Sequence, residues 1–344
     1  MSVPSKSNLL AMDLEEMTVD DLKDVLRSLN LPLSGNKSEL IEKIDYMARN
    51  MPESVFEYDD IKGLDPLIGW AKMTGRLFSP EAVAFGFPRF PSGVLLTGVP
   101  GCGKSMVAKA IANEWGMGFR RVQPDELVGK LIGDNEEFMR NLVTELAEEA
   151  PIVCFIDEAE KILGQTRSQG HYRVADASRD SAESILLQFM EDDNSGVFFV
   201  FTANDYNKMS PALLDRFHGR FFIDLPSSSA RKDIITSMLE IRQRNPSDYD
   251  IDRLVESSDG FSGRDIRTAI DEAMKVAFFE DARALAEADL VKAFSQAIPT
   301  SEIHKEQIVL MREVVSQGKM RRANSQELEA GALVAKDGWQ IAWV

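Results

Sequence analysis

The stretch Gly98-Val-Pro-Gly-Cys-Gly-Lys-Ser105 decides the fold of this chain. It has the form G-x-x-x-x-G-K-[S/T], follows the apolar run 94–97 and precedes residues 106–115, which have the pattern of a helix. A glycine-rich turn between a buried strand and a helix is typical of a phosphate-binding loop, because its backbone N–H groups can close around phosphate oxygens. An ordinary glycine turn before a helix is the alternative, but a chance match in this context is rare.

The loop residues divide into those that shape the turn and those that carry charge or a hydroxyl. We expect Lys104 to hold the β- and γ-phosphates of ATP and Ser105 to offer its hydroxyl to Mg²⁺. Because Cys102 lies beside the phosphate-binding amides, we expect a thiol-alkylating reagent to block nucleotide binding. The remaining residues that we expect around the nucleotide are Gly98, Pro100, Gly101, Gly103 and Met106.

A second motif follows about fifty residues later. Residues 151–158 read PIVCFIDE, an apolar run that ends in two carboxylates. Such a run is typical of a strand buried on both faces of a parallel sheet, and ligands bind at the carboxyl ends of these strands. We expect Asp157 to hold Mg²⁺ through its water shell and Glu158 to polarise the water that attacks the γ-phosphate. An acidic helix N-terminus is the alternative for this pair.

The composition limits the class of protein. With 344 residues, 44% of them hydrophobic, the chain is long enough for two or three compact units. A net charge of −17 argues against non-specific nucleic-acid binding by the whole surface, because an acidic field repels phosphate. Two cysteines, one in each motif, predict a reducing compartment. We see no signal peptide and no run near the roughly 18 apolar residues of a membrane span, so we expect a cytoplasmic protein without a membrane partner.

The hydrophobic pattern divides the chain into five segments. We expect a helix–extended loop–helix module at 1–50, a linker at 51–55 and alternating strands and helices at 56–226. Residues 227–298 predict a small helical lid, and 299–344 form a tail. The fold class is therefore α/β, with the parallel sheet of a P-loop NTPase, the lid and the N-terminal module. The features expected in the tail are a helix at 303–316, a basic cluster of Lys319, Arg321 and Arg322, and a short strand at 339–344.

The N-terminal module resembles a SAP motif. The residues that occupy the core and loop positions of that family are Leu22, Leu26, Leu31, Pro32, Gly35, Lys37, Leu40 and Ile44. The resemblance implies duplex DNA binding through residues 18–44, where Lys37 and the amides of 34–36 would meet a phosphate at a helix N-terminus. Residues 1–50 carry six basic and nine acidic side chains, so a small protein-docking module is an equal alternative.

From about residue 56 to residue 297, the motifs fall in the order of the AAA-clade ATPases, which this chain resembles. The stretch 59–64, DDIKGL, matches the segment that holds the adenine in that family, and the match implies base contacts from Ile61 and Gly63. Residues 78–93 and 298–323 resemble the chloroplast and cyanobacterial open-reading-frame ATPases of this clade. The resemblance implies ATP hydrolysis in a homo-oligomeric ring, which we take as a hexamer.

Two polar residues beyond the motifs take their roles from the resemblance. Asn204 ends the apolar run 197–203 and corresponds to sensor 1, an amide that positions the attacking water. An asparagine that simply makes a turn is the alternative. Arg264 opens the main helix of the lid and resembles the sensor 2 arginine of the wider AAA+ group. Its place at a helix N-terminus favours contact with nucleotide phosphate.

The arginine finger of the family is expected at Arg216. Residues 211–226 match the katanin and spastin version of this segment, although Asp215 replaces the first arginine of the usual pair. Arg216 would reach the γ-phosphate of the neighbouring subunit, with Arg220 as a helper, and a finger supplied in trans requires a ring. A surface salt bridge between Arg216 and Asp215 or Glu114 is the alternative.

A loop at 128–136 aligns with the first pore loop of the family, in which Lys130, Leu131 and Ile132 would face the ring centre. Leu131 replaces the usual aromatic residue, and leucine keeps apolar contact with a threaded polypeptide but loses the flat ring. Packing against the core is the alternative. In the second pore-facing loop, 164–178, Tyr172 and Arg173 would supply what Leu131 lacks, and a flexible surface loop is an equal alternative for these residues.

These motifs favour an enzyme that hydrolyses ATP to remodel or unfold a protein substrate. Through the SAP-like module, that substrate would be attached to DNA. A motor or loader that acts on nucleic acid is the second hypothesis, and a nucleotide-gated scaffold is the third. The basic residues that support the second are Lys130, Arg167, Arg173 and Arg179. Glu158 argues against the third, because a scaffold needs no catalytic base.

Overall fold

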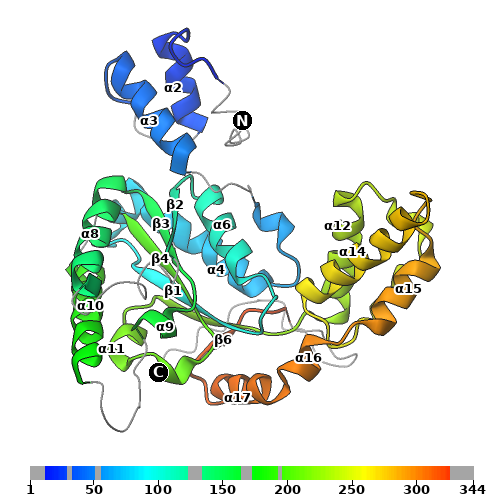
Figure 1. Ribbon diagram of the computed structural model, residues 1–344. Helices are drawn as coiled ribbons and strands as arrows, with labels where there is room; N and C mark the ends of the chain where they lie inside the picture. Colours follow the sequence, from blue (N-terminus) through cyan, green and yellow to red (C-terminus); the bar gives the residue numbers. More distant parts are fainter. Residues whose placement is uncertain are drawn as a thin grey trace.

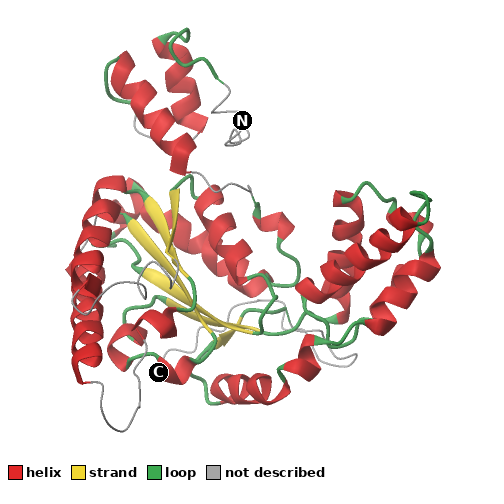
Figure 2. Cartoon of the chain, in the orientation of Figure 1, coloured by secondary structure: helices red, strands yellow, loops and turns green. Residues whose placement is uncertain are grey.

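The computed structural model describes residues 12–28, 33–50, 56–122, 134–163, 173–192 and 196–325. Figure 1 traces the chain and Figure 2 shows its secondary structure: a mixed helix–strand unit in the centre, a helical unit on one side and a helix pair at the N-terminus. In the described part of the chain, no helix has the length and apolar character needed to cross a membrane.

A six-stranded sheet forms the centre of the large unit, and every neighbouring pair of strands is parallel. The spatial order is β2-β3-β4-β1-β5-β6. The strands are β1 (Gly93–Gly98), β2 (Gly118–Val122), β3 (Ile152–Ile156), β4 (Val197–Ala203), β5 (Gly219–Ile223) and β6 (Arg321–Arg322). The central strands β1, β3 and β4 are buried along their whole length, as expected for a parallel sheet covered on both faces.

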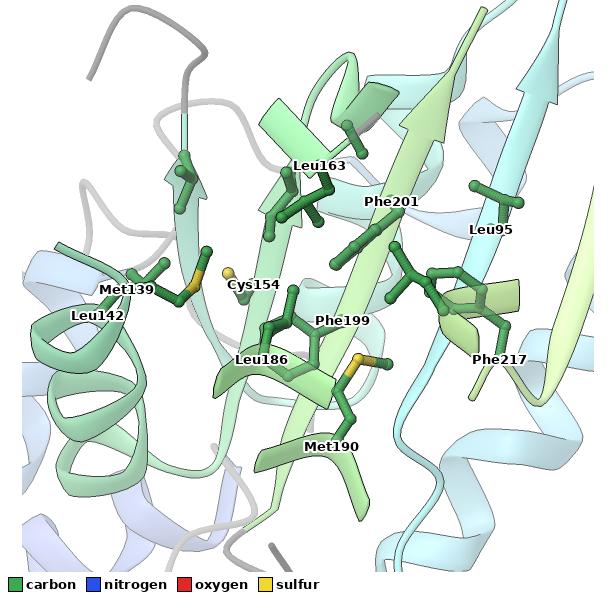
Figure 3. Packing of buried hydrophobic residues seen from close by; sticks show 14 of the residues in the cluster. Leu95, Met139, Leu142, Cys154, Leu163, Leu186, Met190, Phe199, Phe201 and Phe217 are labelled. Atoms are coloured by element: carbon green, nitrogen blue, oxygen red, sulfur yellow. The ribbon is translucent and has the colours of Figure 1, made fainter. Parts of the chain in front are cut away.

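Helices cover both faces of this sheet and bury alternate side chains of each strand. Phe199 and Phe201 of β4 pack toward α8 (Asp134–Glu149) and α10 (Arg173–Asp192), as Figure 3 shows. Phe198 and Val200 of β4 face the opposite way, toward helices α4 (Asp65–Gly75) and α6 (Lys104–Glu114). The remaining helices of the large unit are η1 (Tyr58–Asp60), α4 (Asp65–Gly75), η2 (Arg76–Phe78), α5 (Pro80–Phe85), α6 (Lys104–Glu114), α9 (Ala159–Leu163), η3 (Tyr206–Lys208) and α11 (Pro211–Leu214).

The lid is a separate helical unit with its own apolar core. Its helices are α12 (Ser228–Ile241), η4 (Pro246–Asp248), α13 (Ile251–Glu256), α14 (Gly263–Phe279) and α15 (Glu287–Gln296). The buried side chains that join these helices include Ile235, Leu239, Leu254, Ile266, Ile270, Leu290 and Phe294. Figure 1 shows this unit beside the large unit, with the start of α14 nearest to the sheet.

The N-terminal module consists of α2 (Val19–Ser28) and α3 (Lys37–Asn50). Four of the apolar residues that carry the SAP resemblance, Leu22, Leu26, Leu40 and Ile44, are fully buried between the two helices. In Figure 1 this pair lies next to the β2 edge of the sheet, away from the lid.

Residues 299–325, the described part of the predicted tail, pack against the large unit. This segment forms α16 (Thr300–Ile303) and α17 (Lys305–Ser316) and then adds β6 to the sheet of the large unit. Arg312 donates two hydrogen bonds to the Asp224 carboxylate at 2.8 and 2.9 Å. The Asn324 side chain accepts a hydrogen bond from the backbone N–H of Asp224 and donates one to its carbonyl oxygen. The predicted helix 303–316 corresponds to α17, whereas the basic pair Arg321 and Arg322 is part of the sheet. The strand expected at 339–344 lies outside the described residues.

Candidate active site

The phosphate-binding loop lies between the carboxyl end of β1 and the start of α6. Gly98 has φ 136°, and a Cβ there would lie 2.0 Å from the carbonyl oxygen of Ile223 on the neighbouring strand. Gly101 has φ 81°, and its Cβ would lie 2.8 Å from the side chains of Ser262 and Arg264 in the lid. Both positions therefore require glycine, one for the close approach of β5 and the other for the close approach of the lid.

Lys104 points into the loop that precedes it. Its Nζ atom donates to the carbonyl oxygens of Gly98 at 2.7 Å and Val99 at 3.2 Å. Burial lowers the pKa of this ammonium from its usual value, and the carboxylates of Asp157 and Glu160 act in the opposite direction. The next residue, Ser105, is exposed in the first turn of α6. Lys104 and Ser105 are thus neighbours at the start of α6, and their contacts with phosphate and metal stay predictions.

The two acids of the second motif follow β3, as predicted. Asp157 accepts a hydrogen bond from Thr202 Oγ1 at 2.6 Å on one carboxylate oxygen and from Arg121 Nη2 at 2.9 Å on the other. Glu158 has φ 49° and accepts from Asn204 Nδ2 at 3.2 Å and Lys161 Nζ at 2.5 Å. The structure thus brings Asp157, Glu158 and Asn204 together at the carboxyl ends of β3 and β4, the edge at which open α/β sheets bind ligands.

These donors fit a magnesium ion that phosphates carry into the site. Mg²⁺ prefers oxygen ligands and is usually held by one or two protein groups together with phosphates and waters. Ser105 and Asp157 supply a hydroxyl and a carboxylate of this kind. No group of three or more acidic, histidine or cysteine side chains that could cage a metal occurs among the residues described.

The lid touches the phosphate-binding loop directly. The backbone N–H of Arg264, in the first turn of α14, donates to the carbonyl oxygen of Gly101 at 3.2 Å. Ser262 caps this helix and is reciprocally bonded to Asp265. Arg264 therefore lies beside the phosphate-binding loop, and its contact with nucleotide phosphate stays a prediction.

Cys102 lies in the same contact between loop and lid, where burial raises the pKa of its thiol to about 12. The thiolate is the reactive form of cysteine, so at neutral pH this side chain is a poor nucleophile. The prediction that an alkylating reagent blocks nucleotide binding through Cys102 is therefore not supported by its environment.

The predicted adenine residues lie on the other side of the loop. Ile61 is partly buried against the apolar cluster around α4 and α6, to which Cys102 also packs. Gly63 has φ 73°, and a Cβ there would lie 2.5 Å from Cβ of Ala230 in α12. Its carbonyl oxygen accepts from the backbone N–H of Ser325, so the C-terminal segment also contacts this place.

Arg216 lies at the opposite end of β1 from the phosphate-binding loop. Its carbonyl oxygen accepts from the hydroxyl of Ser92, which immediately precedes β1, at 2.6 Å. A six-residue strand spans about 17 Å, too far for an arginine side chain to reach the phosphates of its own loop. The guanidinium pairs with Glu191 of α10 at 2.5 Å. Neither Asp215 nor Glu114, the partners weighed from the sequence, makes this ion pair.

Of the other predicted residues, the structure describes some and leaves others outside its described ranges. Lys130, Leu131, Ile132 and Tyr172 lie outside the described residues. Arg220 lies within β5, opposite Leu95 of β1. In the N-terminal module, the Lys37 ammonium donates to the carbonyl oxygen of Glu15, and the Asn36 N–H donates to the Glu39 carboxylate. Two of the groups expected to meet a DNA phosphate, the Lys37 ammonium and the Asn36 amide, thus make hydrogen bonds within the module itself.

Sequence reasoning missed two residues that contact Asp157, namely Arg121 and Thr202. Thr202 carried a usable signal, because it is the one hydroxyl in the apolar run VFFVFTA and a buried hydroxyl needs a partner. Arg121 carried none, because its partner comes from a strand that begins about thirty residues later.

The parallel sheet, the loop at Gly98–Ser105 and the acids at its carboxyl edge define a P-loop NTPase with a helical lid. Comparison with protein families identifies the kind. Residues 94–225 match the family described as "ATPase family associated with various cellular activities (AAA)", residues 248–292 match "AAA+ lid domain", and residues 13–46 match "SAP domain". Both resemblances stated from the sequence are therefore confirmed.

Similar proteins include the "Uncharacterized AAA domain-containing protein ycf46" of Pyropia yezoensis, 33% identical over 84% of this chain and 56% of the relative. "Proteasome-activating nucleotidase 1" of Haloferax volcanii is 31% identical over 82% of this chain and 70% of its own length. Human "Fidgetin-like protein 1" is 27% identical over 70% of this chain and 38% of its own length. The chain spans a little over half the length of the ycf46 relatives. It belongs to the AAA family of ATPases, enzymes that hydrolyse ATP.

Proposed function

We propose that this chain hydrolyses ATP with Mg²⁺ and uses the energy to remodel or unfold a protein substrate. The observation that carries the proposal is the meeting of Lys104, Asp157 and Glu158 at one edge of the sheet, with Asn204 bonded to Glu158. In this assignment Lys104 and Ser105 would hold phosphate and metal, Asp157 would hold the metal through its water shell, and Glu158 would be the general base. The chemistry that bound Mg²⁺ supplies is neutralisation of charge on the phosphates.

The proposed assembly is a homo-oligomeric ring, taken as a hexamer. Its support is the distance of Arg216 from its own phosphate-binding loop, which leaves a neighbouring subunit as the place where that guanidinium can act. Arg216 would have to leave Glu191 to do so. An ion pair of this kind near the surface contributes about 1 kcal/mol or less to stability, so Arg216 can leave Glu191 with little loss of free energy.

A protein substrate is favoured over nucleic acid by the relatives and by charge. One relative is named a proteasome-activating nucleotidase, and the chain carries a net charge of −17. The SAP match favours DNA as a second candidate, with the N-terminal module as the attachment point. Its engaged Lys37 and the Glu39 carboxylate at the start of α3 argue instead for a protein partner of that module.

The test is the steady-state ATPase rate of the purified chain, alone and with an unfolded polypeptide, duplex DNA or single-stranded DNA. Lys104→Ala is the blank, and Glu158→Gln should retain ATP while losing turnover. Stimulation by polypeptide alone supports the proposed function, whereas stimulation by DNA alone moves the motor or loader ahead. If no condition gives hydrolysis that depends on Lys104, the nucleotide-gated scaffold is the hypothesis that remains.

A further inference from the structure

Strand β4 is apolar along its buried length except for one side chain, Thr202. This threonine is 1% exposed and follows Phe198 and Val200 on the sheet face that α6 covers. Burying a hydroxyl without a hydrogen-bond partner destabilises the folded chain. A valine has nearly the same shape and carries no such cost, so the hydroxyl requires a reason.

Both partners of that hydroxyl belong to the catalytic acids. Thr202 Oγ1 donates to Asp157 Oδ1 at 2.6 Å and accepts from the backbone N–H of Glu158 at 3.0 Å. A hydroxyl has a single proton, and a backbone N–H can only donate, so the direction of both bonds is fixed. One side chain therefore connects the carboxylate proposed for the metal with the backbone of the proposed base.

The second of these bonds holds a strained residue. Glu158 has φ 49°, a left-handed conformation that is strained for a non-glycine residue. Strand β3 ends at Ile156, so the Glu158 N–H lies beyond the ladder of the sheet. Its bond to Thr202 supports this turn, and the turn directs the Glu158 carboxylate toward Asn204, which directly follows β4.

We propose that Thr202 is a positioning residue that fixes the orientation of Asp157 toward Mg²⁺ and of Glu158 toward the attacking water. The inference rests on the proposed ATPase function. It predicts that loss of the hydroxyl affects the metal-dependent steps, while nucleotide held by the loop alone is little changed. Arg121 holds the other oxygen of Asp157, so the carboxylate stays near the site but is free to turn.

The experiment compares Thr202→Val, which keeps the shape, with Thr202→Ser, which keeps the hydroxyl, in the full chain. Thr97→Val is the matched control, because Thr97 is also buried, lies on the adjacent strand β1 and donates to the sulfur of Met320. The measurements are the Mg²⁺ dependence of ATP hydrolysis, the binding of a fluorescent ADP analogue with Mg²⁺ and with EDTA, and the melting temperature.

For Thr202→Val we expect the half-saturating Mg²⁺ concentration to rise about tenfold and kcat to fall about tenfold, the effect of losing one hydrogen bond to a charged group. Binding of the ADP analogue in EDTA should change less than about twofold. Thr202→Ser should restore the parental Mg²⁺ dependence. Thr97→Val should lower the melting temperature to a similar degree without shifting the Mg²⁺ dependence.

The inference is overturned if Thr202→Val keeps the parental Mg²⁺ dependence, if Thr202→Ser fails to restore it, or if Thr97→Val shifts it equally. Equal loss of binding in EDTA and in Mg²⁺ would also overturn it, since that is the result of a purely structural role. Thr202→Ala replaces the valine variant should that protein not fold. If the parent chain does not hydrolyse ATP, the proposed function fails, and the Mg²⁺ dependence of ADP-analogue binding still tests Thr202.

Discussion

Docking of helix α17 beneath the phosphate-binding loop can be tested with two aliphatic residues of the same helix. Ile308 is 3% exposed and belongs to a buried cluster with Val99 and Phe222, whereas Leu310 is 62% exposed. Truncating a buried isoleucine to alanine removes its burial and leaves a cavity, which costs about 2–5 kcal/mol. The same truncation at an exposed position costs about 0.5 kcal/mol or less. We therefore expect Ile308→Ala, and not Leu310→Ala, to destabilise the nucleotide-binding unit.

The assay is thermal unfolding of the full chain with and without ADP and Mg²⁺. The transition that ligand raises belongs to the unit that binds nucleotide, because a ligand stabilises only the fold to which it binds. For a unit of about 150–250 residues, the expected loss lowers that melting temperature by about 4 °C or more. Equal melting temperatures for the two variants would refute the reasoning, because α17 would then contribute nothing to that unit.

Three further predictions concern single side chains. If Arg216 acts in trans, Arg216→Ala and Lys104→Ala should each lack ATPase activity, and mixing them should restore part of it; a mixture that stays inactive would contradict the assignment. Because burial raises the pKa of Cys102 to about 12, iodoacetamide at pH 8 should modify it far more slowly in the folded chain than in urea, as mass spectrometry of the peptide would report. Burial lowers the pKa of His218 from 6.5, so protonation favours the unfolded chain. Stability should be full above pH 6.5 and fall below it, and His218→Asn should show a shallower fall in melting temperature between pH 7.5 and 5; equal slopes would exclude His218 as the cause.

The sequence predicted the centre of this molecule well because its signals are local. Glycines, an apolar run and a following helix mark the phosphate-binding loop within about twenty residues, and the run 151–158 marks β3 in the same way. Parallel strands place their carboxyl ends at one edge, so Asp157, which directly follows a strand, was expected at that edge. The role of Asn204 came from the AAA resemblance. The lid helices were equally visible, because each has an apolar face of helical period.

The features that sequence reasoning missed depend on contacts between distant residues. Strand β6 is only Arg321 and Arg322, both exposed, and nothing in two basic residues indicates a strand. What holds it is Asn324 bonded to Asp224, about a hundred residues away. The partner of Arg216 was missed for the same reason, because Glu191 lies 25 residues earlier in the chain, on helix α10. Such pairings need the folded chain, since their sequence separation exceeds any periodic pattern.

The two chain connections of the lid meet at one residue of the large unit. The connection into the lid begins at Asp224, directly after β5, and the connection out of it returns through α17, whose Arg312 bonds the Asp224 carboxylate at 2.8 and 2.9 Å. A body held by two segments fixed at one place turns about an axis near that place. The start of α14 touches Gly101 of the phosphate-binding loop, so such a rotation changes the contact between lid and loop. The return path also passes Asn204, whose carbonyl oxygen accepts a hydrogen bond from Gln307 Nε2 at 3.3 Å. A rotation of the lid about Asp224 would therefore move a segment of chain that also contacts Asn204.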